Sequence, residues 1–245
     1  WLKEGENKFG SDSSNAVVFP PKAPKFCGSF TLRNGEVTLR VAKGVAITVN
    51  GKQVMEMKLR NDTDSNTTKL RCGSLLWYVI KRGTEYGIRL RDLENPLLKS
   101  FHGIERYPVD QAWRIEATLE PYSPPKIVLI PTILGTIDSM SSPGALRFEI
   151  DGTTYRIDPV LEDNSDKELF IILGDKTNGA ETYGGGRFIY IPVPDSTGKT
   201  FLDFNKAYNP PCVFTTFATC PLPPSQNKLP IKIPAGEKKW GEANH

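Results

Sequence analysis

Apolar and polar residues alternate along much of the chain with the two-residue period that is typical of β-strands. No stretch of twelve or more residues carries the 3.6-residue apolar stripe of an amphipathic helix. We therefore expect a nearly all-β protein, with strands at residues 36–41, 45–49, 75–81, 85–91, 113–119, 126–134, 168–173 and 187–191. Asn50-Gly51 and Asp151-Gly152 each separate two such segments, and these residue pairs tolerate the positive φ angles of a tight hairpin turn.

Prolines divide the pattern into regions. Pro121, Pro124 and Pro125 interrupt it and suggest two β domains, residues 1–120 and 121–245. Nine of the twenty prolines lie between residues 192 and 234, and proline cannot donate to a β-ladder. Aromatic residues are too frequent in that stretch for a disordered linker. We expect the second domain to be an antiparallel β-barrel or sandwich that ends in an ordered, irregular, proline-rich wrap.

Composition excludes several classes of function. Thirty-one Lys and Arg against 28 Asp and Glu give a net charge of +3, which is too balanced for a dedicated nucleic-acid binder. No apolar run approaches the length of about 20 residues that a membrane-spanning helix needs. The two histidines, His102 and His245, are too few for a His-rich metal site. The chain starts at Trp1, so we expect a processed product whose signal or lipid-attachment segment lay upstream.

The first hundred residues resemble a forkhead-associated (FHA) β-sandwich. The similarity lies in FGSDSSNAVVFP (9–20), GEVTLRVAKGVAITVNGKQV (35–54) and LRCGSLLWYVIKRG (70–83). Ser11 stands where that family has its phosphate-contacting Arg, and the Ser-x-x-His motif is missing. The resemblance therefore implies an FHA-like fold that has lost phosphothreonine recognition.

A second resemblance rests on motifs that follow one another along the chain. They are GSFTLRNG (28–35), RGTEYGIRLRD (82–92), ETYGGGRF (181–188), LDFNKAYNPPC (202–212), TCPLPPSQNKLP (219–230) and AGEK (235–238). Over essentially its whole length the chain is similar to the uncharacterised bacterial and archaeal family called domain of unknown function 1684. This resemblance implies a shared fold, and the family offers no established activity to carry over.

Two groups of polar residues are candidates for a ligand site. Glu181, Tyr183 and Arg187 surround the Gly184–Gly186 run, where backbone can approach a ligand or another strand closely. Glu181 could accept from a ligand and Arg187 could clamp a carboxylate or sugar hydroxyl, or the two could form a structural pair.

Asp203, Asn205, Tyr208 and Asn209 form the second group. Their oxygens suit a polyol or a hard cation such as calcium, although the carboxylate could equally satisfy backbone donors of the wrap. A hairpin between residues 187–191 and 200–204 would place Asp203 beside Arg187 and join both groups in one site.

Cys212 and Cys220 are separated by seven residues, and three states are open to them. A disulfide would close a small loop and stabilise the fold by ~2–3 kcal/mol. The alternatives are buried free thiols and half of a soft-metal site, but the chain offers no Cys-x-x-Cys motif to complete one. We favour the disulfide.

These observations favour a non-enzymatic module of the bacterial cell envelope that binds a small polar ligand or a protein, with no bound metal. A cytoplasmic location is the alternative compartment. The alternative function is a hydrolase that uses Glu181 and Asp203 as acid and base, with a divalent cation as an optional cofactor. A catalytic pair should titrate abnormally in a concave pocket, whereas a structural pair should be fully hydrogen-bonded with a depressed pKa.

Overall fold

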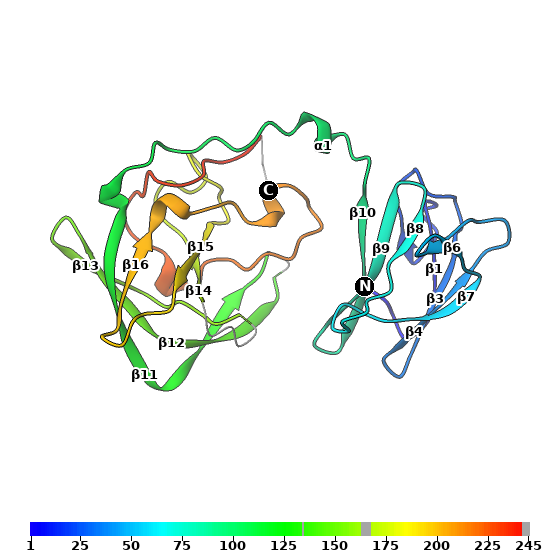
Figure 1. The fold of residues 1–245 in the computed structure, drawn as a ribbon, viewed down its shortest axis with the longest axis horizontal. Coiled ribbons are helices and arrows are strands. Elements are labelled where there is room, and N and C mark those ends of the chain that lie inside the picture. Colours follow the sequence, from blue (N-terminus) through cyan, green and yellow to red (C-terminus); the bar gives the residue numbers. More distant parts are fainter. Residues whose placement is uncertain (134, 163–167, 242–245) are drawn as a thin grey trace. The chain divides into compact units, whose positions relative to one another are not determined.

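The computed structural model describes residues 1–133, 135–162 and 168–241, and the chain divides into two compact units, Trp1–Phe101 and His102–His245 (Figure 1). This division lies before residue 120, where the nearby prolines led us to expect the domain boundary. Residue 120 falls inside the long strand β11 (Arg114–Pro131), whose pairing with β12 (Ile137–Ile150) shifts register between Pro121 and Lys126. The prolines are accommodated as an irregularity within one strand, so they do not mark a domain boundary there.

The first unit is a sandwich of two five-stranded sheets, in the orders β2-β1-β3-β4-β7 and β10-β9-β8-β5-β6. Phe9 and Phe30 from one sheet and Trp77 from the other are fully buried in a common core, which is why both sheets alternate inward apolar and outward polar residues. The strands are β1 (Gly5–Gly10), β2 (Val17–Val18), β3 (Gly28–Arg33), β4 (Glu36–Val41), β5 (Thr48–Val49), β6 (Lys52–Gln53), β7 (Glu56–Leu59), β8 (Leu70–Cys72), β9 (Leu75–Arg82) and β10 (Glu85–Asp92).

The second unit contains a four-stranded sheet, β13-β12-β11-β16, and a two-stranded sheet, β14-β15. Side chains from both sheets pack into one hydrophobic core, among them Leu146, Ile171 and Leu202. The further strands are β13 (Thr153–Ile157), β14 (Glu168–Leu173), β15 (Arg187–Pro192) and β16 (Lys199–Asp203). The nearly all-β fold expected from the sequence is therefore confirmed. No helix in the described residues is long and apolar enough to cross a membrane.

Both predicted hairpin turns are present. Asn50 and Gly51 have φ angles of 50° and 77° between β5 and β6, and Asp151 and Gly152 have 51° and 74° between β12 and β13. Positive φ at both central positions is what a two-residue turn of this kind requires.

The predicted hairpin between β15 and β16 does not form. β16 pairs with β11, with Arg114 opposite Asp203, and β15 pairs with β14 along its whole length. β14 buries nearly all of its side chains. Pairing with β14 therefore places β15 beside a strand of the core, which pairing with the nearer strand β16 would not do. The hairpin from which we inferred that Asp203 lies beside Arg187 is therefore wrong, and the single site built on it stays a prediction.

After β16 the chain forms an irregular wrap, residues 204–241, as the proline content predicts. Its described residues contain the 3-10 turns η2 (Phe204–Lys206), η3 (Pro211–Val213) and η4 (Ser225–Asn227) and isolated bridges to other segments. Before β11 lie α1 (Leu97–Ser100), η1 (Gln111–Trp113) and an extended stretch, residues 102–110, which we call the strap.

Candidate functional site

Arg187 is the centre of a buried polar network. Its side chain is fully buried, and its Nη2 lies 2.7 Å from Oδ2 of the equally buried Asp175. The guanidinium also donates to the carbonyl groups of Ile233, at 3.0 Å, and of Ala235 in the wrap. A buried charge is tolerated only when it is paired and hydrogen-bonded in this way. Arg187 therefore fastens the wrap to β15, and its ionic partner is Asp175, which the sequence analysis missed, and not Glu181.

Two of the three glycines beside Arg187 lie in close contact with other groups, whereas Gly184 has room for a Cβ. Gly186 has a φ of 88°, and a Cβ placed on it would lie 2.5 Å from the Leu173 carbonyl oxygen and 2.5 Å from a carbon of Pro223. At Gly185 a Cβ would lie 2.6 Å from the Tyr183 ring. Of the alternatives left open by the sequence, close approach to another segment of the chain is the one observed.

Glu181 lies on the surface and binds two side chains. It accepts a hydrogen bond from the Tyr107 hydroxyl of the strap at 2.8 Å, and Lys232 of the wrap lies 3.0 Å away. The bond from Tyr107, followed by that from Lys232, lowers the pKa of the Glu181 carboxyl. By the criterion set above, a hydrogen-bonded carboxylate with a lowered pKa favours the structural role over general acid catalysis.

Asp203 and Asn205 serve the backbone around them. Asp203 caps η2 by accepting from the Asn205 amide N–H at 3.1 Å. The Asn205 side chain accepts from the Asp110 N–H at 3.1 Å and donates to the Asp110 carbonyl at 2.8 Å. These are the contacts of the structural alternative, in which polar side chains satisfy irregular backbone.

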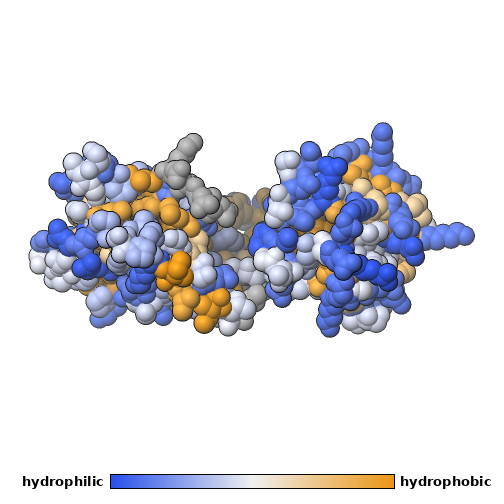
Figure 2. Space-filling model, turned by 90° about the horizontal axis from the view of Figure 1, so that it is seen from below, coloured by the Kyte–Doolittle hydropathy of each residue, from blue (hydrophilic) through white to orange (hydrophobic). Residues whose placement is uncertain are grey.

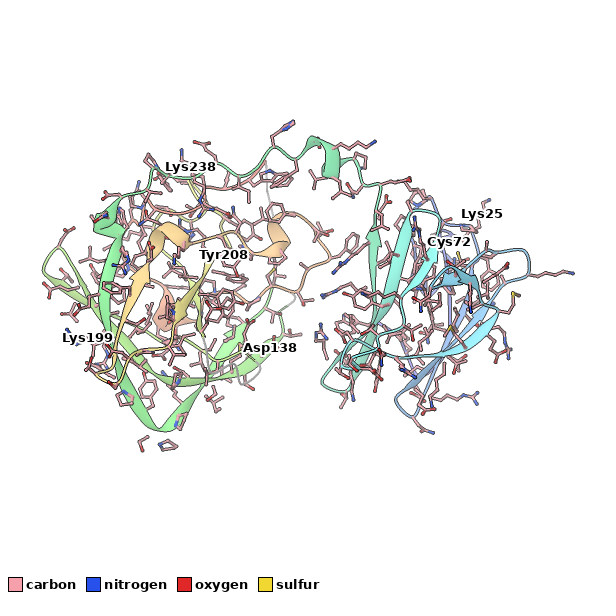
Figure 3. All side chains as sticks on the ribbon, in the orientation of Figure 1. Lys25, Cys72, Asp138, Lys199, Tyr208 and Lys238 are labelled. Atoms are coloured by element: carbon pink, nitrogen blue, oxygen red, sulfur yellow. The ribbon has the colours of Figure 1, made fainter. Side chains whose placement is uncertain are left out.

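A series of contacts nevertheless connects one residue of each predicted group, Arg187 and Asn205. Glu237 of the wrap accepts from Arg106 at 2.9 Å and from the Asn209 N–H at 2.7 Å. Arg106 also donates to the Asn205 carbonyl at 3.0 Å, and the Arg187 guanidinium reaches the Glu237 carbonyl at 3.4 Å. We call Arg187, Asp175, Glu237, Arg106 and Asn209 the clasp. In Figure 3, Lys238, which follows Glu237, lies against the strap, to whose Glu105 its N–H donates at 2.8 Å.

Tyr208 belongs to an aromatic stack. Its ring lies parallel to that of Tyr190, with 6.3 Å between the centroids, and Tyr190 stacks in turn on Phe170 at 4.9 Å. Burial raises the pKa of the Tyr208 hydroxyl. Packing of this kind accounts for Tyr208 without a ligand.

Tyr183 is buried beside Cys212 and Cys220. Both cysteines carry free thiols in the structure, so the expected disulfide is not formed in it. The Cys212 N–H donates to Cys220 Sγ at 3.1 Å, and Tyr183 packs in the same buried cluster as both cysteines. Within the described residues, no group of three or more His, Cys, Asp and Glu side chains could hold a metal ion.

The first unit has a surface hollow of about 460 Å³ beside the segment that follows β1. Asp12 lies in its wall, and hydrogen bonds from Ser14 lower the pKa of that carboxyl and keep it charged. Lys8 and Lys25 line the same hollow, and the loss of phosphothreonine recognition stays a prediction that rests on Ser11. The residues around the hollow are Lys8, Asp12, Ser14, Asn15, Lys25 and Phe26.

The edge of β11 that faces away from β12 is covered only at its two ends. β16 pairs with residues 114–118, and at the far end the Leu222 N–H of the wrap donates to the Pro131 carbonyl at 2.7 Å. Along residues 126–130, which we call the open edge, no ladder partner is present in the part of the chain that the structure describes.

The hydrogen bonds of Pro131 and Thr132 show to which side each backbone group of the strand points. The Thr132 N–H donates toward β12, to Thr136, whereas the Pro131 carbonyl points to the wrap. Because these directions alternate along a strand, Ile127 and Leu129 direct their N–H and C=O groups to the open edge. Their side chains are 62% and 63% exposed. Figure 2 shows hydrophobic residues gathered on the surface of the second unit.

The wrap leaves the edge open because of its prolines. Continuing the Thr132–Pro221 register would set Pro223 and Pro224 opposite Ile130 and Leu129, and neither proline has an N–H to donate. Lys126 does not guard the edge, since its Nζ lies 2.7 Å from Asp158, a buried carboxylate. Sequence analysis predicted the strand here but could not show that one of its edges lacks a partner.

Comparisons place the second unit in a family. Residues 99–238 match the family described as "Protein of unknown function (DUF1684)". This match is narrower than the whole-chain resemblance expected, and the FHA-like character of the first unit stays a prediction. An uncharacterized protein of Haloarcula marismortui, solved by solution NMR, is 27% identical over 60% of this chain and 81% of its own, with a TM-score of 0.49.

No curated protein matches the sequence. The family match runs through the strap, all strands of the second unit and most of the wrap. It includes the clasp, both cysteines and the open edge. Because the matched residues make up more than half of the sequence, the chain belongs to the DUF1684 family of proteins of unknown function.

Proposed function

We propose that the second unit is a protein-binding module that adds an extended segment of a partner protein as a new strand along the open edge of β11. The observation that supports this is the unpaired backbone of Ile127 and Leu129, flanked by their own exposed apolar side chains. In strand addition, main-chain hydrogen bonds supply affinity and alternate side chains supply specificity.

The surroundings of the edge fit an extended apolar segment. Ile137, which pairs with Pro131 across the β11–β12 ladder, is 67% exposed and extends the apolar surface. Natural proteins usually protect such an edge with an outward lysine or an edge proline. Here the one lysine of the open edge is held by Asp158, and the neighbouring prolines, Pro125 and Pro131, lie just outside the open edge.

The polar groups considered in the sequence analysis support a binding module indirectly. The clasp and Glu181 fasten the strap and wrap, so they hold the sheet that presents β11. In this proposal neither Glu181 nor Asp203 acts as acid or base. Location in the cell envelope belongs to the proposal as well, and it would place the edge where secreted or surface proteins are encountered.

A display experiment with a matched control tests the proposal. A phage-displayed library of random twelve-residue peptides is selected on the full chain, and the recovered peptides are measured by fluorescence anisotropy. We expect peptides with alternating apolar residues. Leu129→Lys should weaken them by about tenfold or more, equivalent to about 1.4 kcal/mol. Val109→Lys, which changes another aliphatic residue with 85% exposure, should leave binding unchanged.

The peptide backbone gives a second readout. Methylation of the peptide amides that face β11 should remove binding, because strand addition needs those N–H groups, whereas methylation of the alternate amides should be tolerated. Binding that ignores the methylation pattern, or selection that yields no peptide, would contradict the proposal. Analytical ultracentrifugation gives a further test. If the chain forms a dimer that Leu129→Lys disrupts, the partner at the open edge is a second copy of this chain, and the proposal is contradicted.

A further inference from the structure

Cys212 and Cys220 form a close thiol pair within the wrap. The Cys212 N–H lies 3.1 Å from Cys220 Sγ, and both residues are almost fully buried. The Cys220 thiol and the Tyr183 hydroxyl beside the Cys212 sulfur lower the pKa of the Cys212 thiol below its ordinary value. Stabilised thiolates are the nucleophilic form of cysteine.

The cysteines of the first unit provide an internal contrast. Cys27 is buried, and its thiol donates to the Pro24 carbonyl at 3.6 Å. Burial raises the pKa of Cys27 to about 11 and also raises the pKa of Cys72. Contact with Cys212 and burial raise the pKa of Cys220 as well, so the first attack on a disulfide falls to Cys212. The four cysteines therefore divide into one pair with a stabilised thiolate and one pair without.

The chain between Cys212 and Cys220 gives a route to the pair. In residues 213–219 the structure contains no strand, and Phe217 is 92% exposed. Segments that are not held by ladder hydrogen bonds open locally at lower cost than strands of the core. A small disulfide can therefore reach Cys212 through opening of this loop without unfolding of the sheet.

We propose that Cys212 and Cys220 are a redox-active dithiol, in which Cys212 attacks a disulfide of the glutathione class and Cys220 resolves the product. The Cys212 thiolate bonds to one sulfur of oxidised glutathione, and the second sulfur leaves as a thiolate. The Cys220 thiolate then bonds to Cys212 Sγ and displaces the remaining glutathione. The chain loses two electrons and two protons, and the oxidant becomes two thiols.

Tyr183 is the positioning residue of this pair. Its hydroxyl holds the reduced Cys212 sulfur, and the residue lies beside the glycines that pack against Pro223. Oxidation removes the thiolate that Tyr183 serves and links the two ends of the loop covalently. An oxidising compartment, such as the envelope predicted from the sequence, would favour the linked form.

Thiol mapping of the full chain tests the proposal. The folded protein is incubated with oxidised glutathione, remaining thiols are alkylated, and peptides are identified by mass spectrometry. We expect Cys212 and Cys220 to be lost together as one disulfide-linked peptide pair while Cys27 and Cys72 remain free. Cys220→Ser should instead accumulate glutathione on Cys212, because the resolving thiol is missing.

Tyr183→Phe separates a positioning role from simple proximity. It should move the pH midpoint of Cys212 alkylation upward, since the hydroxyl that stabilises the thiolate is gone. Circular dichroism checks that each variant is folded. The thiol mapping of the wild-type chain tests the proposal even if a variant does not fold. Free Cys212 and Cys220 after prolonged exposure, preferential oxidation of Cys27 and Cys72, or an unchanged midpoint in folded Tyr183→Phe would overturn the proposal.

Discussion

The two units of this protein hold their β-sheets together by different means. In the first unit two sheets close on an apolar core in which Phe9, Phe30 and Trp77 pack ring against ring. In the second unit the sheets share an apolar core too, but an irregular wrap completes the fold through the buried clasp. A sandwich pairs its backbone groups in ladders, whereas a proline-rich wrap has to find side-chain partners.

The first prediction breaks the comparison at its strongest point. Arg187→Met should destabilise the second unit by about 3–5 kcal/mol, because it leaves the buried Asp175 carboxylate unpaired. Leu39→Ala should cost the first unit about 2–5 kcal/mol through a cavity and spare the second. Hydrogen exchange followed by mass spectrometry measures both. Equal protection of residues 204–241 in Arg187→Met and wild type would refute the role of the clasp.

The second prediction concerns the glycine run. Gly186→Ala should destabilise the second unit by about 2 kcal/mol, since its φ of 88° and the Leu173 carbonyl 2.5 Å away both oppose a Cβ. Gly184→Ala is the matched control, because the nearest atom to its Cβ would be 3.8 Å away. Chemical denaturation should give a lower midpoint for Gly186→Ala alone. Similar midpoints for the two variants would show that the run does not pack as described.

The smallest effect is expected at the surface. The pKa of the Glu181 carboxyl is lower in the folded protein than its unfolded value near 4.5. The contribution of Glu181 to the free energy of unfolding is therefore fully present above pH 4.5, and it is lost as the pH falls through the folded pKa. Glu181→Gln should therefore lower the denaturation midpoint slightly at neutral pH and not in acid. High salt should shrink this difference in midpoint, because Glu181 and Lys232 are both solvent-exposed. A difference that persists in acid would assign Glu181 another role.

Local patterns in the sequence predicted local structure well. Residues 36–41 and 168–173 coincide with β4 and β14, and both Asn-Gly and Asp-Gly turns form where the residues require them. Alternation and turn chemistry depend on neighbouring residues only, so a single sequence contains them. The irregular wrap was predictable for the same reason, since proline excludes ladder pairing wherever it stands.

Distant partners were not predictable. Arg187 pairs with Asp175 and with wrap carbonyls about 50 residues away, and Arg106 pairs with Glu237 across 131 residues. The hairpin expected between β15 and β16 assumed that strands close in sequence pair, whereas burial gave each strand another partner. Charge patterns identify residues that need a partner, but only the packed sheet determines which partner is within reach.

The difference between the units also bears on function, because the wrap that completes the second unit leaves part of β11 unpaired. Amide hydrogen exchange of the folded chain by NMR tests this most directly. The N–H groups of Val128 and Ile130 face β12 and should exchange slowly, while those of Ile127 and Leu129 should exchange rapidly at the open edge. Equal protection of all four amides would mean that the edge is covered, and it would contradict the proposed binding of an extended partner.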